Sequence, residues 1–100
     1  MKKLDIIDHI AIQVNNIQDS LNWYIKNFKC NILYSDDTWA FIEFSNTKLA
    51  LVTHIEHPPH VAILDNYLKI NNKVIRHRDG SYSRYLQDLD GNYIELIKYS

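Results

Sequence analysis

The chain has 100 residues, of which 46% are hydrophobic and 12% aromatic, and its formal net charge is −1. This composition is enough for one small folded domain with a core, and it argues against disorder. The near-neutral charge provides no clustered basic surface, so we expect neither nucleic-acid binding nor binding to an anionic membrane. Cys30 is the single cysteine, and no apolar run reaches the length of a signal peptide core or a membrane span, which favours a cytoplasmic protein.

The first half of the chain is predicted to form one helix among four strands. Polar and apolar residues alternate over 9–14, the period of a half-buried strand. Apolar residues recur at helical spacing over 17–28, and Asn16 is a suitable N-cap, which predicts a helix there. Runs rich in aromatic and β-branched residues over 30–35, 38–45 and 48–54 then predict three antiparallel strands. The predicted order is therefore strand, helix, strand, strand, strand.

The second half repeats this order after Pro58 and Pro59. Residues 60–64 are predicted as a strand, 64–72 as a short helix, and 73–77, 81–88 and 92–99 as three further strands. The two glycines of the chain, Gly80 and Gly91, both fall between predicted strands, where a turn needs a positive φ. The element order thus indicates a duplicated βαβββ module whose second helix is shortened.

Sequence similarity between the halves supports the duplication. Residues 9–12, HIAI, align with residues 60–63, HVAI, and residues 49–52, LALV, align with residues 94–97, IELI. His9 and His60 are therefore equivalent, and Glu95 is the counterpart of Ala50. Paired modules bring equivalent positions towards a common centre, so we expect the two histidines to meet. Two imidazoles and one carboxylate form a set that suits Fe(II), Mn(II), Ni(II) or Zn(II) with positions left open.

Three motifs resemble the vicinal oxygen chelate superfamily, which includes glyoxalase, bleomycin-resistance and extradiol dioxygenase proteins. The motifs are DHIAIQV near the start, HVAIL in the middle and DLDGNYIEL near the end, and the resemblance extends from about residue 6 to residue 99. It implies an α+β fold in which two tandem modules, about 6–55 and 58–99, form one glyoxalase-like domain over 1–100, with a curved mixed sheet around a cavity. It also implies that His9, His60 and Glu95 occupy three positions for ligands of a divalent metal.

The chain departs from the four-ligand pattern of this superfamily at Ala50, which cannot bind a metal. Two histidines and one glutamate are instead similar to the set of extradiol dioxygenases and fosfomycin-modifying thiol transferases. Only Glu95 is left to move a proton, which makes two-base isomerase chemistry less favoured. The resemblance therefore implies a metal-dependent dioxygenase, lyase, isomerase or transferase that polarises vicinal oxygens of a small molecule.

Further residues are candidates for the same site. Tyr85 precedes Glu95 by ten residues on the predicted hairpin partner, and the resemblance implies a catalytic acid or orienting group there. Simple packing of its ring on the sheet is the alternative. Arg84 is a candidate for binding a substrate carboxylate or phosphate, although it also suits a solvent-facing position. Three aromatic residues either line an apolar pocket or belong to the core: Trp39, Phe41 and Tyr82.

Other interpretations remain open at this stage. Glu95 could pair with Arg84 or Lys98 across neighbouring strands rather than bind a metal. The protein could also be a non-enzymatic dimer that sequesters a small molecule, as bleomycin-resistance proteins do, or a subunit of a larger assembly. The resemblance implies a homodimer, and bound metal distinguishes the enzyme from the sequestering protein.

Overall fold

The computed structural model describes residues 3–54 and 57–99. The chain divides into two compact units, of which the N-terminal unit comprises residues 9–59 and the C-terminal unit comprises residues 1–8 together with 60–100. The boundaries fall between Asp8 and His9 and between Pro59 and His60. The beginning of the first strand therefore belongs to the unit that contains the second half of the chain.

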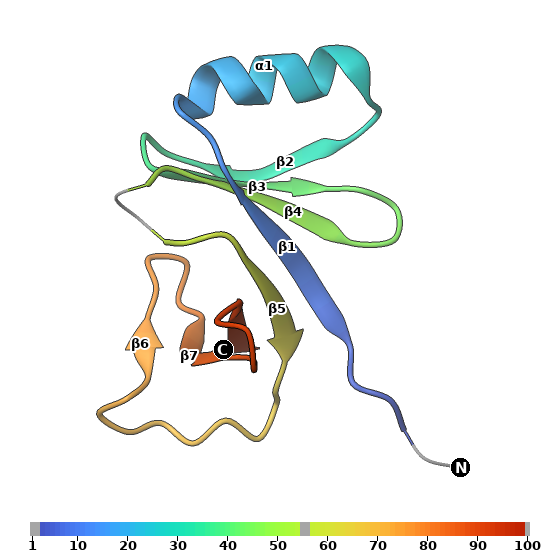
Figure 1. The fold of residues 1–100 in the computed structure, drawn as a ribbon. Helices are drawn as coiled ribbons and strands as arrows, with labels where there is room; N and C mark the ends of the chain where they lie inside the picture. The colour runs from blue at the N-terminus through green and yellow to red at the C-terminus, as the bar shows by residue number, and fades with distance from the viewer. Residues whose placement is uncertain (1–2, 55–56, 100) are drawn as a thin grey trace. The chain divides into compact units, whose positions relative to one another are not determined.

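The N-terminal unit contains one helix and a mixed sheet (Figure 1). Its elements are β1 (Ile7–Gln13), α1 (Ile17–Asn27), β2 (Asn31–Ser35), β3 (Trp39–Glu43) and β4 (Lys48–Val52). Strand β1 belongs to this unit from His9 onward. The strands lie in the order β2-β3-β4-β1. Strands β2, β3 and β4 are antiparallel neighbours, and β1 runs parallel to β4. This is the predicted βαβββ order.

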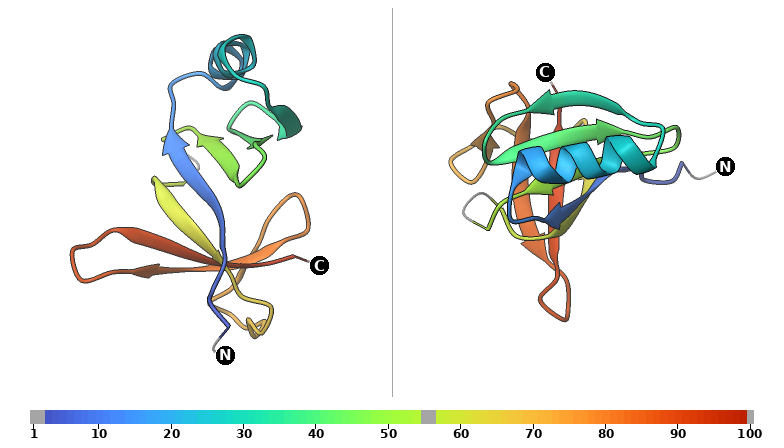
Figure 2. Two further views of the ribbon diagram at one scale, coloured as in Figure 1. Left: turned by 90° about the vertical axis from the view of Figure 1, so that its right-hand side faces the viewer. Right: turned by 90° about the horizontal axis from the view of Figure 1, so that it is seen from above.

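Helix α1 covers one face of this sheet (Figure 2, right). Asn16 caps its start by accepting a hydrogen bond from Asp19 N at 2.8 Å, as predicted. The helix buries Ile17 and Leu21 in a core cluster with three sheet residues, Ala40, Ile42 and Leu51. Among the residues that the structure describes, no helix is long and apolar enough to cross a membrane.

The other face of the same sheet carries a second apolar cluster. Ala11, Phe41 and Ala50 are its buried members, and Tyr34 and Trp39 pack against them. Successive residues of a strand point to opposite faces, so β3 directs Ala40 and Ile42 to the helix and Phe41 to this cluster. His9 lies two residues before Ala11 on β1 and therefore shares this face.

The C-terminal unit contains a second mixed sheet. Its strands are β5 (His60–Leu64), β6 (Ile75–Arg76), β7 (Tyr82–Gln87) and β8 (Tyr93–Lys98), in the order β5-β8-β7-β6. Strand β5 is parallel to β8, and the pairs β6–β7 and β7–β8 are antiparallel. The long β7–β8 hairpin is clear in Figure 2, left. Gly80 and Gly91 have φ values of 87° and 86°, which confirms their predicted place in turns.

The helix predicted over residues 64–72 is wrong. The structure has turns and bends there, and no helix forms in the described part of the C-terminal unit. Asp65 and Asn71 explain the difference, since their side chains accept hydrogen bonds from the backbone N–H of Tyr67 (3.0 Å) and Lys73 (2.9 Å). Such local bonds compete with helix formation. The strand predicted over 73–77 is likewise shortened to Ile75–Arg76.

Candidate functional site

Glu95 is a buried carboxylate at the centre of the C-terminal unit's sheet. It lies on the middle strand β8, next to Ala62 of β5 and Tyr85 of β7, and it is only 3% exposed. His60 starts β5 two residues before Ala62, so it shares the face of Glu95. Its Nε2 atom lies 3.2 Å from Glu95 Oε1. The structure therefore brings together two of the three residues predicted to bind a metal.

A second histidine, which the sequence pattern did not indicate, also contacts this carboxylate. Nε2 of His77 lies 3.3 Å from Glu95 Oε2 and 2.5 Å from Oγ of Ser83, a fully buried residue. His77 follows the two-residue strand β6 within the segment Arg-His-Arg. That basic segment resembles a solvated turn, so no signal in the sequence pointed to a role for its central residue.

The alternative in which Glu95 pairs with Arg84 or Lys98 is wrong. In the β7–β8 register Arg84 lies opposite Leu96, and Lys98 lies opposite Tyr82. All four residues are an odd number of positions from Tyr85 or Glu95 on their strands, so they point to the other face of the sheet. The structure likewise does not bring Arg84 and Tyr82, the predicted substrate-binding residues of this hairpin, to the face of Glu95.

Tyr85 does lie on the face of Glu95, directly opposite it across the hairpin. Its ring meets the His60 ring edge-on, with centroids 5.2 Å apart and an interplanar angle of 87°. Its hydroxyl oxygen is buried. The predicted proximity of Tyr85 to the carboxylate therefore holds, and its chemical role remains a prediction.

His9, the third predicted ligand, is buried at 3% exposure in the N-terminal unit. The Phe41 ring contacts its imidazole edge-on, at 4.8 Å between centroids and 77° between planes. Ala50 lies beside Ala11 and opposite Phe41, so the counterpart of Glu95 in this unit belongs to an apolar cluster. Within its own unit, His9 therefore lies beside a largely aromatic and apolar surface.

Trp39 and Phe41 lie on the face of His9, and Phe41 is a buried core residue, which agrees with the alternative that it belongs to the core. Trp39 stacks on Tyr34 with centroids 4.4 Å apart, and its ring also meets Phe41 edge-on at 5.2 Å. Lys48 places its Nζ 5.1 Å from the centre of the Phe41 ring, a cation–π arrangement. Lys48 also pairs with His9 in the register of β1 and β4. This wall is therefore aromatic with one flanking cation.

Asp8, the residue before His9, is held within the C-terminal unit by hydrogen bonds of its segment. Leu64 N donates a hydrogen bond of 3.0 Å to Ile6 O, and the Tyr99 hydroxyl donates one of 2.5 Å to Asp8. Burial of the Tyr99 ring, together with this bond to Asp8, raises the pKa of Tyr99 above its ordinary value. Asp8 is thus anchored to the residue that follows β8, and His9 is the next residue along the chain.

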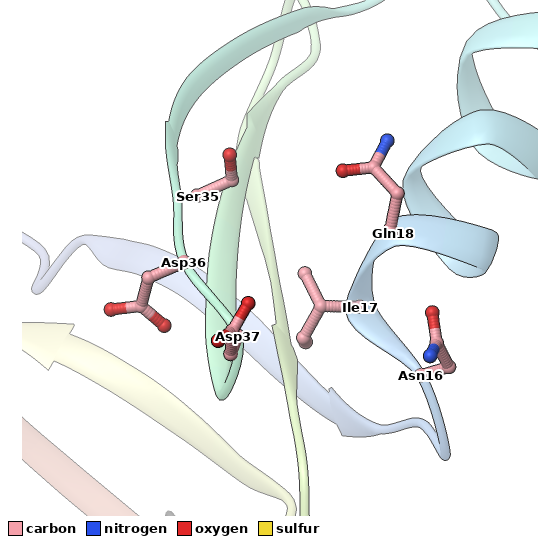
Figure 3. A pocket seen from close by; sticks show the side chains of 6 residues that line it. All are labelled: Asn16, Ile17, Gln18, Ser35, Asp36 and Asp37. Atoms are coloured by element: carbon pink, nitrogen blue, oxygen red, sulfur yellow. The ribbon is translucent and has the colours of Figure 1, made fainter.

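A separate pocket of about 370 Å³ opens on the N-terminal unit (Figure 3). It lies between the start of α1, at Asn16 to Gln18, and the turn after β2, at Ser35 to Asp37. Asp36 is used within that turn, because its carboxylate accepts hydrogen bonds from Thr38 N and Trp39 N at 2.8 and 2.9 Å. The pocket is therefore formed by a turn and a helix cap, and it contains none of the predicted site residues.

Comparison with solved structures identifies the architecture. Methylmalonyl-CoA epimerase from Mycobacterium tuberculosis superimposes with a TM-score of 0.80 at 15% identity, covering 100% of this chain and 93% of that one. A single-residue variant of methylmalonyl-CoA epimerase from Streptomyces coelicolor, in complex with 2-nitronate-propionyl-CoA, gives 0.77 at 16% identity over 98% and 99% of the two chains. The chain has the fold of these epimerases.

A hypothetical protein from Bacillus halodurans C-125 is similar to the same extent, with a TM-score of 0.78, 22% identity and coverage of 98% and 96%. No protein-family model matches the sequence. No curated protein matches it either. Methylmalonyl-CoA epimerase belongs to the vicinal oxygen chelate superfamily, so the predicted glyoxalase-like fold is confirmed, and at these identities the likeness extends to the fold alone.

Proposed function

We propose that the protein is a divalent-metal-dependent enzyme of the vicinal oxygen chelate superfamily, with His9, His60 and Glu95 as the metal ligands. The observation that carries the proposal is the buried carboxylate of Glu95, held 3.2 Å from His60 Nε2. His9, the third proposed ligand, is likewise buried, at 3% exposure within the N-terminal unit. Two imidazoles and one carboxylate suit Fe(II), Mn(II), Ni(II) or Zn(II) and leave positions for substrate or water.

The donors fit such an ion in their chemistry and their surroundings. Glu95 and both histidines are buried, and a buried carboxylate needs a positively charged or hydrogen-bonding partner. The sheet directs Arg84 and Lys98 to its other face, so neither of these cations competes for Glu95. Imidazole nitrogens beside a carboxylate oxygen are therefore the donors that an entering cation would meet.

A bound metal would supply Lewis-acid polarisation of two neighbouring substrate oxygens. Tyr85, opposite Glu95 on the same face, would hydrogen-bond a substrate oxygen or give it a proton. Trp39 and Phe41, on the face of His9, would exclude water and hold the apolar part of the substrate. Ala50 offers no group that can move a proton, so proton transfer would fall to Glu95 or Tyr85, and a two-base epimerisation is not favoured.

Metal content tests this proposal directly. Untagged protein purified without chelator is expected to carry close to one transition metal per chain by elemental analysis. His9→Ala and Glu95→Ala are each expected to lose it, whereas His54→Ala, which changes an exposed histidine, is expected to retain it. Wild-type protein that stays free of metal after addition of Fe(II), Ni(II) or Zn(II) would overturn the proposal.

A second candidate function is non-enzymatic binding of an aromatic or amphipathic small molecule. The stacked Tyr34 and Trp39 rings beside Phe41 favour it, since aromatic walls suit a flat ligand. Tight binding of such a ligand by metal-free protein, with no conversion, would support this function over the enzyme. Because a variant of the Streptomyces coelicolor epimerase forms a complex with 2-nitronate-propionyl-CoA, acyl-CoA thioesters belong in the substrate panel, with vicinal diols and dicarbonyls beside them.

A further inference from the structure

The two oxygen atoms of the Glu95 carboxylate have different histidine partners. Oε1 lies 3.2 Å from Nε2 of His60, and Oε2 lies 3.3 Å from Nε2 of His77. The last side-chain torsion of a glutamate has a broad energy profile, so the contacts of its two oxygens decide how the carboxylate is turned. His77 therefore restrains the orientation in which Oε1 faces His60.

His77 is itself held at its backbone. Its N–H donates to Ser81 O at 2.8 Å, and its carbonyl accepts from Gly80 N at 3.0 Å. Asp79 fixes the same turn, since its Oδ1 accepts from Ser81 N at 2.9 Å and from Ser81 Oγ at 2.6 Å. Gly80 supplies the positive φ that the turn needs. The turn thus sets the place of the His77 Cα after only two residues of β6.

The imidazole of His77 is held as well. Its Nε2 lies 2.5 Å from Oγ of Ser83, which is fully buried on β7. The His77 side chain is 14% exposed, so it reaches inward although Arg76 and Arg78 beside it are exposed. His77 therefore differs from its two exposed neighbours, because its side chain contacts the buried Glu95 carboxylate instead of solvent.

We propose that His77 is a positioning residue for Glu95, holding Oε2 so that Oε1 is presented on the side of His60 to a bound metal. This inference rests on the proposed function. His77 acts through Glu95, because its Nε2 contacts Oε2 while Oε1 is the oxygen on the side of His60. Partners of this kind orient metal-binding carboxylates, and their loss commonly weakens metal affinity by about 10–100-fold.

The test measures Co(II) binding by the full untagged chain, through competition with a chelator and through the visible absorption spectrum of the Co(II) protein. His77→Phe is expected to weaken Co(II) affinity by roughly 10–100-fold and to change the spectrum, because the carboxylate is free to turn. His77→Gln is expected to restore most of both, since its side-chain amide can reach Oε2 from a similar position. His54→Phe is the matched control and should match wild type.

Each result decides between the proposals. Wild-type affinity and an unchanged spectrum in folded His77→Phe protein would overturn the positioning role while the metal site stands. Failure of the wild type to bind Co(II), Ni(II) or Zn(II) would instead overturn the proposed function and this inference with it. If His77→Phe does not fold by circular dichroism, Ser83→Ala replaces it, because it removes the second contact of the His77 ring and should weaken Co(II) binding to a lesser degree.

Discussion

The two units share one scaffold and differ in what their equivalent positions hold. In the C-terminal unit the Tyr85 ring meets His60 edge-on, and Tyr85 lies opposite Glu95. In the N-terminal unit His9, Phe41 and Ala50 take the places of His60, Tyr85 and Glu95. The Phe41 ring meets His9 edge-on, and Phe41 lies opposite Ala50. Each pair of parallel strands also has the same register relative to its histidine.

The difference between the units is a matter of polarity. In the C-terminal unit His60 contacts a carboxylate and a phenol, and a second histidine contacts the same carboxylate. In the N-terminal unit the His9 ring meets Phe41, which belongs to a cluster with two alanines and Trp39. The same backbone geometry therefore supports a polar half and an apolar half.

The largest expected effect comes from making the N-terminal unit resemble the C-terminal one with Ala50→Glu. The new carboxylate would be buried against Phe41, and Lys48, which flanks that ring, would offset only part of the desolvation, so metal-free protein should be destabilised by roughly 4 kcal/mol. Zn(II) should then raise the melting temperature of Ala50→Glu by more than that of wild type, because the metal binds the folded state only and would gain a fourth protein ligand.

Ala50→Leu is the control for this change, because it adds an apolar side chain of similar size. Overpacking should cost it about 1–3 kcal/mol, with a response to Zn(II) no greater than that of wild type. If Zn(II) raises the melting temperatures of Ala50→Glu and Ala50→Leu equally, a carboxylate at position 50 does not bind the metal as Glu95 is proposed to do.

The next largest effect is expected from truncating the residue that packs the helix of the N-terminal unit, compared with a residue of the turn segment in the C-terminal unit. Leu21, 1% exposed, fixes α1 to the sheet, so Leu21→Ala should lower the free energy of unfolding by about 3 kcal/mol. Leu68, 7% exposed, lies in the turn segment that stands in place of the second helix, and Leu68→Ala should cost about 2 kcal/mol because turns relax more easily around a cavity. Urea unfolding measures both, and the reverse order would mean that the turn segment anchors its unit more firmly than the helix does.

The smallest effect concerns the turn that precedes the last strand of each unit. Hydrogen bonds from the Asn92 side chain and backbone lower the pKa of Asp88 below its ordinary value of 3.8. A depressed carboxyl pKa adds stability above about pH 4, and this stability is lost as the pH falls through the lowered pKa. The corresponding turn of the N-terminal unit, closed by Phe44 N to Thr47 O at 2.9 Å, has Ser45 and Asn46 at its tip and no carboxylate there.

Unfolding measured between about pH 6 and pH 2.5 tests this difference. Wild type should lose more stability on acidification than Asp88→Asn does, while Ser45→Ala should follow the wild-type slope. Identical slopes for wild type and Asp88→Asn would show that the turn carboxylate is not linked to folding.

Much of the fold could be predicted because its signals are local. Alternation over 9–14, the Asn16 cap and the two glycines each specify backbone conformation within a few residues, and each prediction is confirmed. The prediction of a helix over 64–72 is wrong because of other local interactions, which oppose helix formation. Asp65 and Asn71 bind the backbone of their own segment, and that competition was not visible in the apolar spacing alone.

The duplication is visible in the sequence without coordinates, because residues 9–12 align with 60–63 and residues 49–52 align with 94–97. These alignments make His9 equivalent to His60 and Ala50 equivalent to Glu95. Strand pairing and turn geometry decide which groups other than His60 contact the Glu95 carboxylate. Strand register directs Arg84 and Lys98 away from it, and the turn after β6 brings in His77 from 18 residues earlier in the chain. Such contacts depend on the register between strands and on where a turn ends. The periodicity of a single segment predicts neither the register nor the end of the turn.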